Sequence, residues 1–367
     1  MSFNNIYKNK KILVTGNTGF KGSWLTEWLL QLNAKVSGLS NGVPTNPSHF
    51  ETANHKERIR YYEKDIRNLQ DMITVLNDVK PDFIFHLAAQ PLVRLSYENP
   101  VLTMETNIIG TMNVLEALRV TNIKCNAIMI TSDKAYDNVE WVWGYRETDH
   151  LGGKDPYSAS KGAAELIIKT YVESYFKKKD SNVRLAIGRA GNVIGGADWA
   201  VDRIVPDAIK AWSVNRTVEI RSPNSTRPWQ HVLEPLSGYL LLGQKLAEDG
   251  NLNGEPFNFG PTSEQNHSVA ELLIEMQKYW PQGEWIDMSH GANKVHEANL
   301  LKLNCDKALH YLGWQPVMRF RETVEMTMQW YSSFYKNDLK IESVTASQIM
   351  KYEDIARERN ICWMVKK

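Results

Sequence analysis

The chain has 367 residues with nearly balanced charge, because its 43 basic and 42 acidic residues leave a net charge of +1. It therefore offers no field that would favour nucleic acid or an anionic membrane as a partner. Its length exceeds one minimal core and predicts a large α/β domain with a second lobe. The three cysteines, Cys125, Cys305 and Cys362, form no CxxC pair or metal-ligand cluster, so we expect a reduced, cytoplasmic protein without a structural metal.

The first ten residues contain no apolar signal core, and no later stretch is long and uncharged enough to cross a bilayer. We therefore expect a protein that is neither exported by a cleavable signal nor embedded in a membrane.

Short apolar runs alternate with amphipathic stretches through the first half of the chain. The runs expected as strands are 11–15, 35–39, 60–62, 83–87, 128–130 and 183–187. The stretches expected as helices lie near 20–32, 68–79, 101–120 and 157–178. This alternation predicts an α/β fold with a Rossmann-type, doubly wound parallel sheet and helices on both faces.

After Arg189 the alternation weakens and prolines interrupt the pattern. Helices expected near 204–214, 233–248, 268–280 and 321–336, with short strands between them, predict a smaller, mixed α/β lobe. We assign 1–190 to the dinucleotide-binding domain, with a returning segment at about 231–260, and 191–230 with 261–340 to the substrate lobe. The C-terminal tail, 341–367, is polar, with Trp363 as its only large anchor.

A glycine-rich run follows the first expected strand and opens the first expected helix. Its glycines permit a tight turn and close backbone approach, while the helix N-terminus faces a pyrophosphate. The spacing is G-x-x-G-x-x-G, and the flanking strand and helix distinguish the run from a plain turn. The cofactor contacts that it predicts are Gly16, Thr18, Gly19, Phe20, Lys21 and Gly22.

The second expected strand lacks the acid that usually binds the ribose of NAD. No Asp or Glu occurs between Glu27 and Glu51, and no Lys or Arg between Lys35 and Lys56 is available for the extra phosphate of NADP. Ser40 is therefore the expected ribose contact, and NAD is the preferred cofactor. After the third strand, Asp65 and Ile66 could flank the adenine, although Asp65 fits a helix cap equally well.

Small residues end the fourth expected strand. Leu87, Ala88 and Ala89 would let the dinucleotide backbone lie close, and we expect Gln90 beside the substrate. Asn107 lies in a helical stretch, where asparagine is a poor helix former. Either its amide bridges backbone groups beside the site, or it is merely tolerated there.

Two short runs carry the candidate acid and base groups. Tyr157 and Lys161 are four residues apart on an expected helix and face the same way, so the lysine can lower the pKa of the phenol and make it a base. Asp133 and Lys134 follow Ser132 at the end of an apolar run and would bring further acid and base groups to the same point. A simple alcohol dehydrogenation does not need that many. The alternative is a strand-end ion pair without chemistry.

With these residues assembled, the chain resembles the extended short-chain dehydrogenase/reductase family. The glycine run, Asp65-Ile66, 87–90, Asn107, Ser132 and the Tyr157/Lys161 pair all match its motifs, over the chain to about residue 335. Within that family, longer runs are similar to those of the nucleotide-sugar 4,6-dehydratases that act on CDP-D-glucose; these runs are 16–24, 131–136, 141–145, 155–165, 191–199 and 227–232. The related dTDP-glucose and GDP-mannose types carry Asp-Glu where this chain has Asp133-Lys134, and the CDP-glucose type usually has Cys where this chain has Ala135.

The resemblance implies a redox-neutral lyase with tightly bound NAD, which would convert CDP-D-glucose into CDP-4-dehydro-6-deoxy-D-glucose for deoxysugar, O-antigen-type synthesis. Tyr157 would remove the 4-hydroxyl proton, and Ser132 would hold that oxygen in line. Asp133 is assigned as the acid for the departing 6-hydroxyl and Lys134 as the base for the C5 proton. Burial would raise the pKa of Asp133 and lower that of Lys134, whereas pairing of the two charges would do the reverse. These two roles could therefore be exchanged.

Two other functions share parts of this pattern. An NAD-dependent sugar-nucleotide 4-epimerase would need everything except Asp133 and Lys134, and a catalytically silent dinucleotide sensor would need only the glycine run. Dehydration removes one water from the substrate, whereas epimerisation leaves its mass unchanged. Mass spectrometry of the product therefore distinguishes a dehydratase from an epimerase.

The second lobe supplies the candidate groups for the sugar nucleotide. Cations and an amide can hold the diphosphate, and aromatic faces can take the base or sugar. The candidates are Asn192, Trp199, Arg203, Arg221, Arg227, Trp229 and His296. For each of them, a surface charge or a core aromatic is the alternative. The stretches 101–120 and 157–178 could pair with their copies in a homodimer or homotetramer, as is common in the resembled family, or could pack on the sheet instead.

Overall fold

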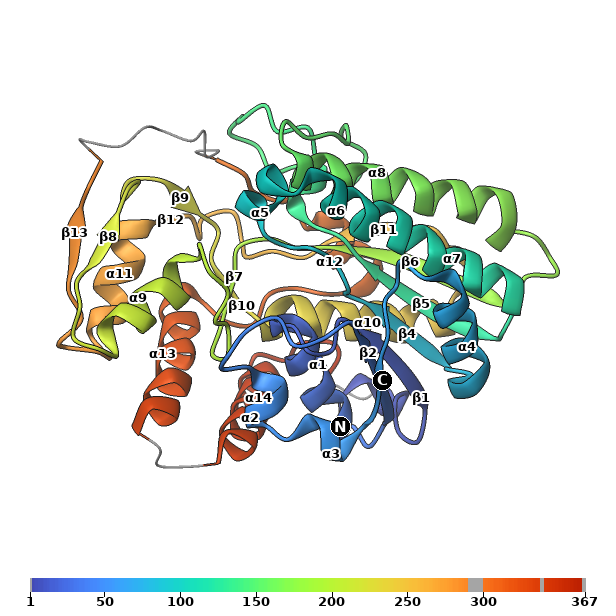
Figure 1. The fold of residues 1–367 in the computed structure, drawn as a ribbon, viewed down its shortest axis with the longest axis horizontal. Helices are drawn as coiled ribbons and strands as arrows, with labels where there is room; N and C mark the ends of the chain where they lie inside the picture. The colour runs from blue at the N-terminus through green and yellow to red at the C-terminus, as the bar shows by residue number, and fades with distance from the viewer. Residues whose placement is uncertain (1, 290–299, 337–339, 365–367) are drawn as a thin grey trace.

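The computed structural model describes residues 2–289, 300–336 and 340–364. At its centre is a seven-stranded parallel sheet with the strand order β11-β6-β5-β4-β1-β2-β3 (Figure 1). The strands are β1 (Lys11–Thr15), β2 (Lys35–Ser40), β3 (Arg60–Glu63), β4 (Phe83–His86), β5 (Cys125–Ile130), β6 (Val183–Arg189) and β11 (Pro256–Asn258). The predicted Rossmann-type fold is confirmed, and β11 brings the second half of the chain back to the sheet edge.

Helices cover both faces of this sheet (Figure 1). One face carries α4 (Leu69–Val79), α7 (Gly110–Thr121) and α8 (Pro156–Tyr171), and the other carries α1 (Phe20–Gln31) and α10 (Leu233–Glu248). Side chains alternate between the two faces along a strand, which explains this arrangement. In β1, Leu13 is buried against α4 and α7, while Ile12 and Val14 are buried on the face that carries α1 and α10. Strands that bury side chains on both faces therefore require both helical layers.

Two of the predicted helices are not regular throughout. The stretch expected at 101–120 is α6 (Pro100–Met104), a π-helical turn (Glu105–Ile109) and α7, and α8 also runs into a π-helical turn (Val172–Phe176). Shorter helices fill the connections between the strands and the longer helices, namely α2 (His49–Thr52), α3 (His55–Arg58) and α5 (Val93–Glu98). The first π-helical turn places Asn107 beside the end of β4, as described below.

The smaller lobe, at the left of Figure 1, consists of short paired strands and helices. Strand β7 (Val193–Ile194) pairs with β10 (Gln230–His231), β9 (Thr226–Arg227) with β12 (His267–Ser268), and β8 (Val218–Ile220) with β13 (Trp285–Asp287). Its helices are α9 (Ile204–Trp212) and α11 (Val269–Gln277), and α12 (Asp306–Leu312) follows beneath the sheet edge. Loops therefore make up much of this lobe.

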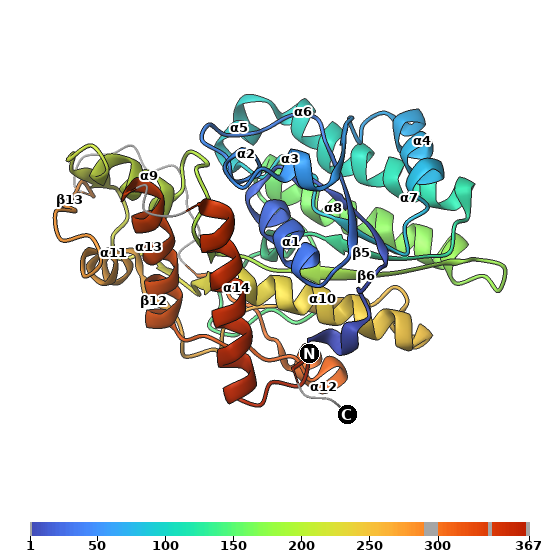
Figure 2. The ribbon, with the colours of Figure 1, turned by 90° about the horizontal axis from the view of Figure 1, so that it is seen from below.

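The C-terminal region forms two helices, α13 (Phe320–Lys336) and α14 (Ile341–Glu358), which lie side by side (Figure 2). The segment expected as a polar tail thus contains a long helix that packs on α1, where Trp28 Nε1 donates to Glu353 Oε1 at 3.0 Å. Beyond α14, the ring of Trp363 stacks on that of Phe3, with centroids 4.9 Å apart. Among the described residues, no helix is long and apolar enough to cross a membrane.

Candidate active site

The predicted acid and base groups meet where β5 ends and α8 begins. Ser132 follows β5 and caps a short 3-10 turn, Asp133–Ala135, by accepting a hydrogen bond from Lys134 N at 3.2 Å. Asp155 caps α8 by accepting from Ser158 N at 2.9 Å, and Pro156 occupies the first helical position. These two caps fix Tyr157 in the first turn of α8 and Lys161 one turn later.

Ser132 is the centre of the group. Its Oγ donates to Asp133 Oδ1 at 2.9 Å, and both the Ser132 hydroxyl and the charge of Asp133 act on the pKa of the Tyr157 phenol. Lys134 Nζ lies 5.9 Å from the centroid of the Tyr157 ring. The structure therefore brings Ser132, Asp133, Lys134 and Tyr157 together, as the sequence predicts.

Burial dominates the protonation of the Tyr157/Lys161 pair. It raises the pKa of Tyr157 to about 12, although the Ser132 side chain lowers this pKa, and the charge of Asp133 raises it further. Burial also lowers the pKa of Lys161 to about 8, helped by the charge of Lys21 and opposed by that of Glu165. The expected lowering of the Tyr157 pKa is thus not found in the protein alone, because desolvation outweighs the effect of the neighbouring groups.

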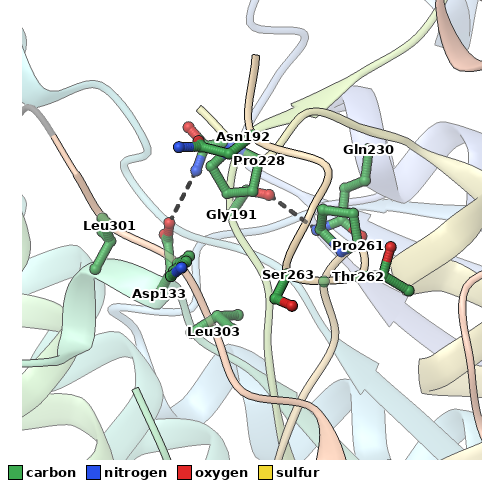
Figure 3. Close-up of a pocket in the computed structure, with 13 residues that line it drawn as sticks. Asp133, Gly191, Asn192, Pro228, Gln230, Pro261, Thr262, Ser263, Leu301 and Leu303 are labelled. Carbon is green, nitrogen blue, oxygen red and sulfur yellow. Dashed lines mark hydrogen bonds between the residues drawn. The ribbon is translucent and has the colours of Figure 1, made fainter. Parts of the chain in front are cut away.

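Asp133 lies at the wall of a pocket between the sheet edge and the small lobe (Figure 3). Its side chain is buried, and Asn192 Nδ2 donates to Oδ2 at 3.3 Å. A Cβ added at Gly191 would lie only 1.8 Å from Asp133 Oδ2, so the carboxylate occupies the space that this glycine leaves. Gly191 was not among the predicted site residues, although it begins the matched run 191–199.

Gln230 is a second residue that sequence reasoning missed. Its Nε2 donates to Gly191 O at 2.9 Å and to Phe259 O at 3.1 Å, while its buried Oε1 has no hydrogen-bond partner among the described residues. Gln230 lines the same pocket as Asp133 (Figure 3). Its two hydrogen bonds join the loop at Gly191 to the loop at Phe259.

The glycine run has the form of a dinucleotide-binding loop. Gly16 has a φ of 74°, and a Cβ there would lie 2.7 Å from Ala88 N, so the loop packs directly on the backbone at the end of β4. The first turn of α1 has no acidic residue, and its N-cap, Gly19, makes no side-chain capping bond. These uncapped amides suit an anionic pyrophosphate, so the loop fits the predicted cofactor.

Ser40 holds this loop against β2. Its Oγ donates to Asn17 Oδ1 at 3.0 Å and accepts from Thr18 N at 3.4 Å, and the Asn17 amide fills the space beside Gly38. Asn17, which was not among the predicted residues, is fully buried, and its Nδ2 has no hydrogen-bond partner within the described part of the chain. The ribose contact of Ser40 stays a prediction.

Asp65 does not cap a helix. Arg67 Nη2 pairs with Asp65 Oδ2 at 2.7 Å, and Arg67 N donates to Oδ1 at 2.9 Å. The N-cap of α4 is instead Asn68, which accepts from Gln70 N at 3.0 Å, so the helix-cap alternative for Asp65 is wrong. Ile66 is buried next to Gly110, and its adenine contact stays a prediction.

Asn107 bridges backbone groups. Its Oδ1 accepts from Gln90 N at 2.8 Å, and its Nδ2 donates to Gln90 O at 3.1 Å and to Ser160 Oγ at 2.8 Å. It therefore joins the end of β4 to α8. The side-chain amide of Gln90 is engaged with Leu92 and Thr103, which favours a structural role over the predicted substrate contact.

The lobe candidates fall into two groups. The Trp199 and Trp229 indoles are both buried, Trp199 against Phe334 with centroids 4.9 Å apart and Trp229 with Nε1 donating to His267 O at 3.1 Å, so the core-aromatic alternative describes them. The arginines differ in their surroundings. Arg203 Nη1 pairs with Asp198 Oδ2 at 2.8 Å, Arg227 Nη1 donates to Thr226 O at 2.8 Å, and Arg221 lines a wider, more open pocket of the lobe. His296 lies outside the described residues.

Lys21 is closer to the catalytic groups than its place in the glycine run suggested. Burial lowers its pKa to about 8, and the charges that act on it are those of Arg203, Asp133 and Asp198. It therefore adds positive charge between the loop and Asp133.

A buried ion pair supports the site from behind. Arg189, at the end of β6, pairs with Glu165 on α8, and Nε lies 2.8 Å from Glu165 Oε1. Thr131 Oγ1, at the end of β5, donates to the same carboxylate oxygen at 2.6 Å. This pair locks α8 to β5 and β6 and was not found from the sequence. Among the described residues, no group of His, Cys, Asp and Glu is arranged to hold a metal ion.

Comparisons with known proteins agree with this architecture. The chain is 45% identical over 339 residues to the CDP-glucose 4,6-dehydratase of Salmonella typhimurium, covering 91% of this chain and 94% of that protein. A UDP-glucose 4-epimerase from Thermotoga maritima, solved with UDP-glucose, has a TM-score of 0.74 at 23% identity and covers 88% of this chain and 99% of its own. A dTDP-glucose 4,6-dehydratase from Streptomyces venezuelae, solved with NAD, has a TM-score of 0.72 at 21% identity over 88% of this chain and 96% of its own. The family model described as GDP-mannose 4,6 dehydratase matches residues 13–327, and the chain belongs to that family.

Proposed function

We propose that this protein is an NAD-dependent CDP-D-glucose 4,6-dehydratase, which makes CDP-4-dehydro-6-deoxy-D-glucose for deoxysugar synthesis of the O-antigen type. The observation that carries the proposal is the convergence of Asp133 and Lys134 with Tyr157 around Ser132. The 45% identical relative supports the same reaction and the same nucleotide.

The glycine loop and the small residues after β4 would hold NAD, which supplies the reaction with a hydride acceptor at C4 and a hydride donor at C6. Its oxidised nicotinamide also carries the positive charge that the Tyr157 pocket needs. Since burial alone raises the pKa of Tyr157 to about 12, cations beside the phenol favour the phenolate. Lys161 is the residue of this chain that serves the same purpose.

Each protein group has one proton to move or one atom to hold. Tyr157 takes the proton of the 4-hydroxyl, and Ser132 keeps that oxygen in line. Lys134 takes the proton from C5, which the C4 ketone has made acidic, and later returns it there. Asp133 protonates the departing 6-hydroxyl so that it leaves as water.

The diphosphate end of the substrate would lie against the small lobe. Asn192 stands beside Asp133 at the pocket wall, Arg221 lines the second pocket of the lobe, and Arg227 lies on β9 between residues that line the two pockets. Arg227 can bind a phosphate in a bidentate manner, which a lysine cannot. Arg203 is the weaker candidate, because Asp198 already neutralises it.

Incubation with the CDP, UDP, dTDP and GDP forms of glucose, followed by mass spectrometry, tests the proposal. We expect loss of one water from the CDP sugar, without net formation of reduced cofactor. A product of unchanged mass would instead identify an NAD-dependent sugar-nucleotide 4-epimerase, and turnover of another nucleotide alone would refute the substrate assignment.

The proposal includes a homodimer or homotetramer. Exposed apolar side chains gather on α6, the following π-helical turn and α8, and those that stand out are Val101, Ile109 and Leu166, which are 68%, 41% and 57% exposed. A second copy of the same helices would bury them in a shared helical bundle. Light scattering of Leu166→Glu, with Leu309→Glu on α12 as the control, should give a monomer only for the first. A wild-type monomer at micromolar concentration would exclude the assembly.

We also propose the cytoplasm as its compartment. Cys125 and Cys305 are free thiols, which suits a reducing environment, and sugar nucleotides are made where their nucleoside triphosphates are available. Recovery of the enzyme in the periplasmic fraction of cells that express it would contradict this assignment.

A further inference from the structure

A short helix of the large domain holds the backbone of the candidate base from outside α8. Helix α5 packs against α8 and lies on the side of the domain that faces the small lobe (Figure 1 and Figure 2). On α5, the hydroxyl of Ser96 accepts a hydrogen bond from Tyr157 N at 3.2 Å and donates one to Val93 O at 2.6 Å. Because a hydroxyl has a single proton, its bond to Val93 leaves a lone pair fixed toward Tyr157 N.

This bond supplies a partner that α8 cannot provide for itself. The first N–H groups of a helix have no carbonyl of their own helix to bind. In α8 the first position is Pro156, which has no N–H, and the N-cap Asp155 accepts from Ser158 N at 2.9 Å. The N–H of Tyr157 lies between them, and Ser96 caps it from another helix. Since Ser96 is fully buried, this cap is shielded from water.

The same helix is also tied to the small lobe. Arg94 Nη1, on α5, pairs with Asp202 Oδ1 at 2.5 Å, and Asp202 belongs to the loop that precedes α9. That loop is held within the lobe, because Asp198 Oδ1 accepts from Ala200 N at 3.1 Å and Asp198 N donates to the hydroxyl of Tyr331 on α13 at 3.2 Å. Helix α5 therefore has one bond to the lobe and one to the first turn of α8.

We propose that Ser96 is a positioning residue for Tyr157, and that α5 connects this residue to the small lobe through the Arg94–Asp202 ion pair. The inference rests on the proposed function, in which the lobe binds the diphosphate while Tyr157 takes a proton from the sugar. Proton transfer requires the two oxygens to lie within hydrogen-bond distance, so the phenol must keep its place relative to the surface that holds the substrate. The two bonds of α5 maintain that relation.

Ser96→Ala removes the acceptor of Tyr157 N and leaves the first turn of α8 to Asp155 alone. We expect kcat to fall about tenfold with KM nearly unchanged, because the base is displaced and the lobe is not. Ser96→Thr keeps the hydroxyl and should restore most of this loss. Ser237→Ala, on α10, is the matched control and should retain wild-type kcat. Ser237 is also fully buried, donates to the carbonyl three residues before it and accepts from Trp314 Nε1 at 3.0 Å.

A double-mutant cycle tests the connection to the lobe. The Arg94–Asp202 pair is partly exposed, so its substitution leaves the core intact. Asp202→Asn should lower kcat about threefold, and exchange of the two charges in Arg94→Asp with Asp202→Arg should restore it. In the Ser96→Ala background, Asp202→Asn should have no further effect, because the link to Tyr157 is already broken. Losses that simply add would refute the link, and full kcat in Ser96→Ala would refute the positioning role.

Hydrogen–deuterium exchange separates this inference from the proposed function. Ser96→Ala and Asp202→Asn should both speed amide exchange in the first turn of α8, whether or not a sugar nucleotide is converted. If the wild type converts none of the four nucleotide sugars, the proposed function fails while the exchange result still decides the role of α5. Unchanged exchange in both variants would contradict the inference even in an active dehydratase.

Discussion

The catalytic edge of the sheet and the substrate lobe are built in different ways. At the edge, regular β5, β6 and α8 carry the reactive groups, and buried hydrogen bonds such as Thr131 Oγ1 to Glu165 at 2.6 Å hold them. In the lobe, two- and three-residue strands carry the cations, and the pocket beside Arg221 is wide and open. The comparison indicates that rigidity is concentrated where atoms react, while the nucleotide end is formed by loops that can differ between relatives.

The largest effect should come from the catalytic edge. Tyr157→Phe removes the phenol that takes the 4-hydroxyl proton, so we expect kcat to fall by about a thousandfold. Tyr171→Phe, at the end of the same helix, should stay close to wild type. Because burial raises the pKa of Tyr157 to about 12, wild-type kcat/KM should rise with pH as the phenolate fraction grows. A variant with less than a tenfold loss would show that Tyr157 is not the base.

The contact between α10 and the segment that precedes α13 should respond to pH. Glu234, on α10, accepts hydrogen bonds from Val317 N at 2.9 Å and Met318 N at 2.6 Å, and burial raises its pKa to about 7. Since this exceeds the unfolded value of about 4.3, folding favours the protonated acid, and this contribution to stability is full below pH of about 4 and is lost as pH rises through about 7.

Glu234→Gln cannot titrate, which makes it the matched comparison. The free energy of unfolding of the wild type, relative to this variant, should fall by about 3 kcal/mol between pH of about 4 and about 8. Urea unfolding at several pH values measures it. A constant difference would mean that Glu234 keeps an ordinary pKa.

A methyl group next to Asp133 tests how rigid the edge is. Gly191→Ala would place its Cβ 1.8 Å from Asp133 Oδ2, so the carboxylate must move. We expect a loss of about thirtyfold in kcat, within the range for displacing an acid group, with little change in KM. Gly250→Ala, where the nearest atom would be 3.4 Å away, is the control. Full activity of Gly191→Ala would show that the Asp133 carboxylate can move to make room for the methyl group without loss of function.

The smallest effect should come from the lobe. Arg227→Lys keeps the charge but loses bidentate contact with a phosphate, so we expect KM to rise about tenfold with kcat nearly unchanged. Arg216→Lys, at an exposed position of the same lobe, should leave both constants as they are. A fall in kcat instead would mean that the lobe also positions the reacting carbons.

The same division explains what could be predicted from the sequence. Strand periodicity and the glycine run predicted the sheet, and residues that end parallel strands converge at one edge, so Ser132, Asp133 and Tyr157 were expected to meet. Trp199 and Trp229 could not be placed, because burial in an irregular lobe depends on distant partners such as Phe334 and His267. Gly191 and Gln230 were missed for a related reason. Their importance depends on contacts across loops, which leave no periodic signal.

The pairing of Phe3 with Trp363 has a practical consequence for the whole chain. Phe3 N donates to Trp363 O at 2.9 Å, and the two rings stack, so the first and last described segments form one small structural unit beside α1. A chain whose ends are joined in this way is topologically close to a ring. A short linker between the ends, with new termini opened in a surface loop, should therefore give a circularly permuted enzyme. Removal of the segment around Phe3 would leave Trp363 without this contact, and removal of the segment around Trp363 would do the same to Phe3.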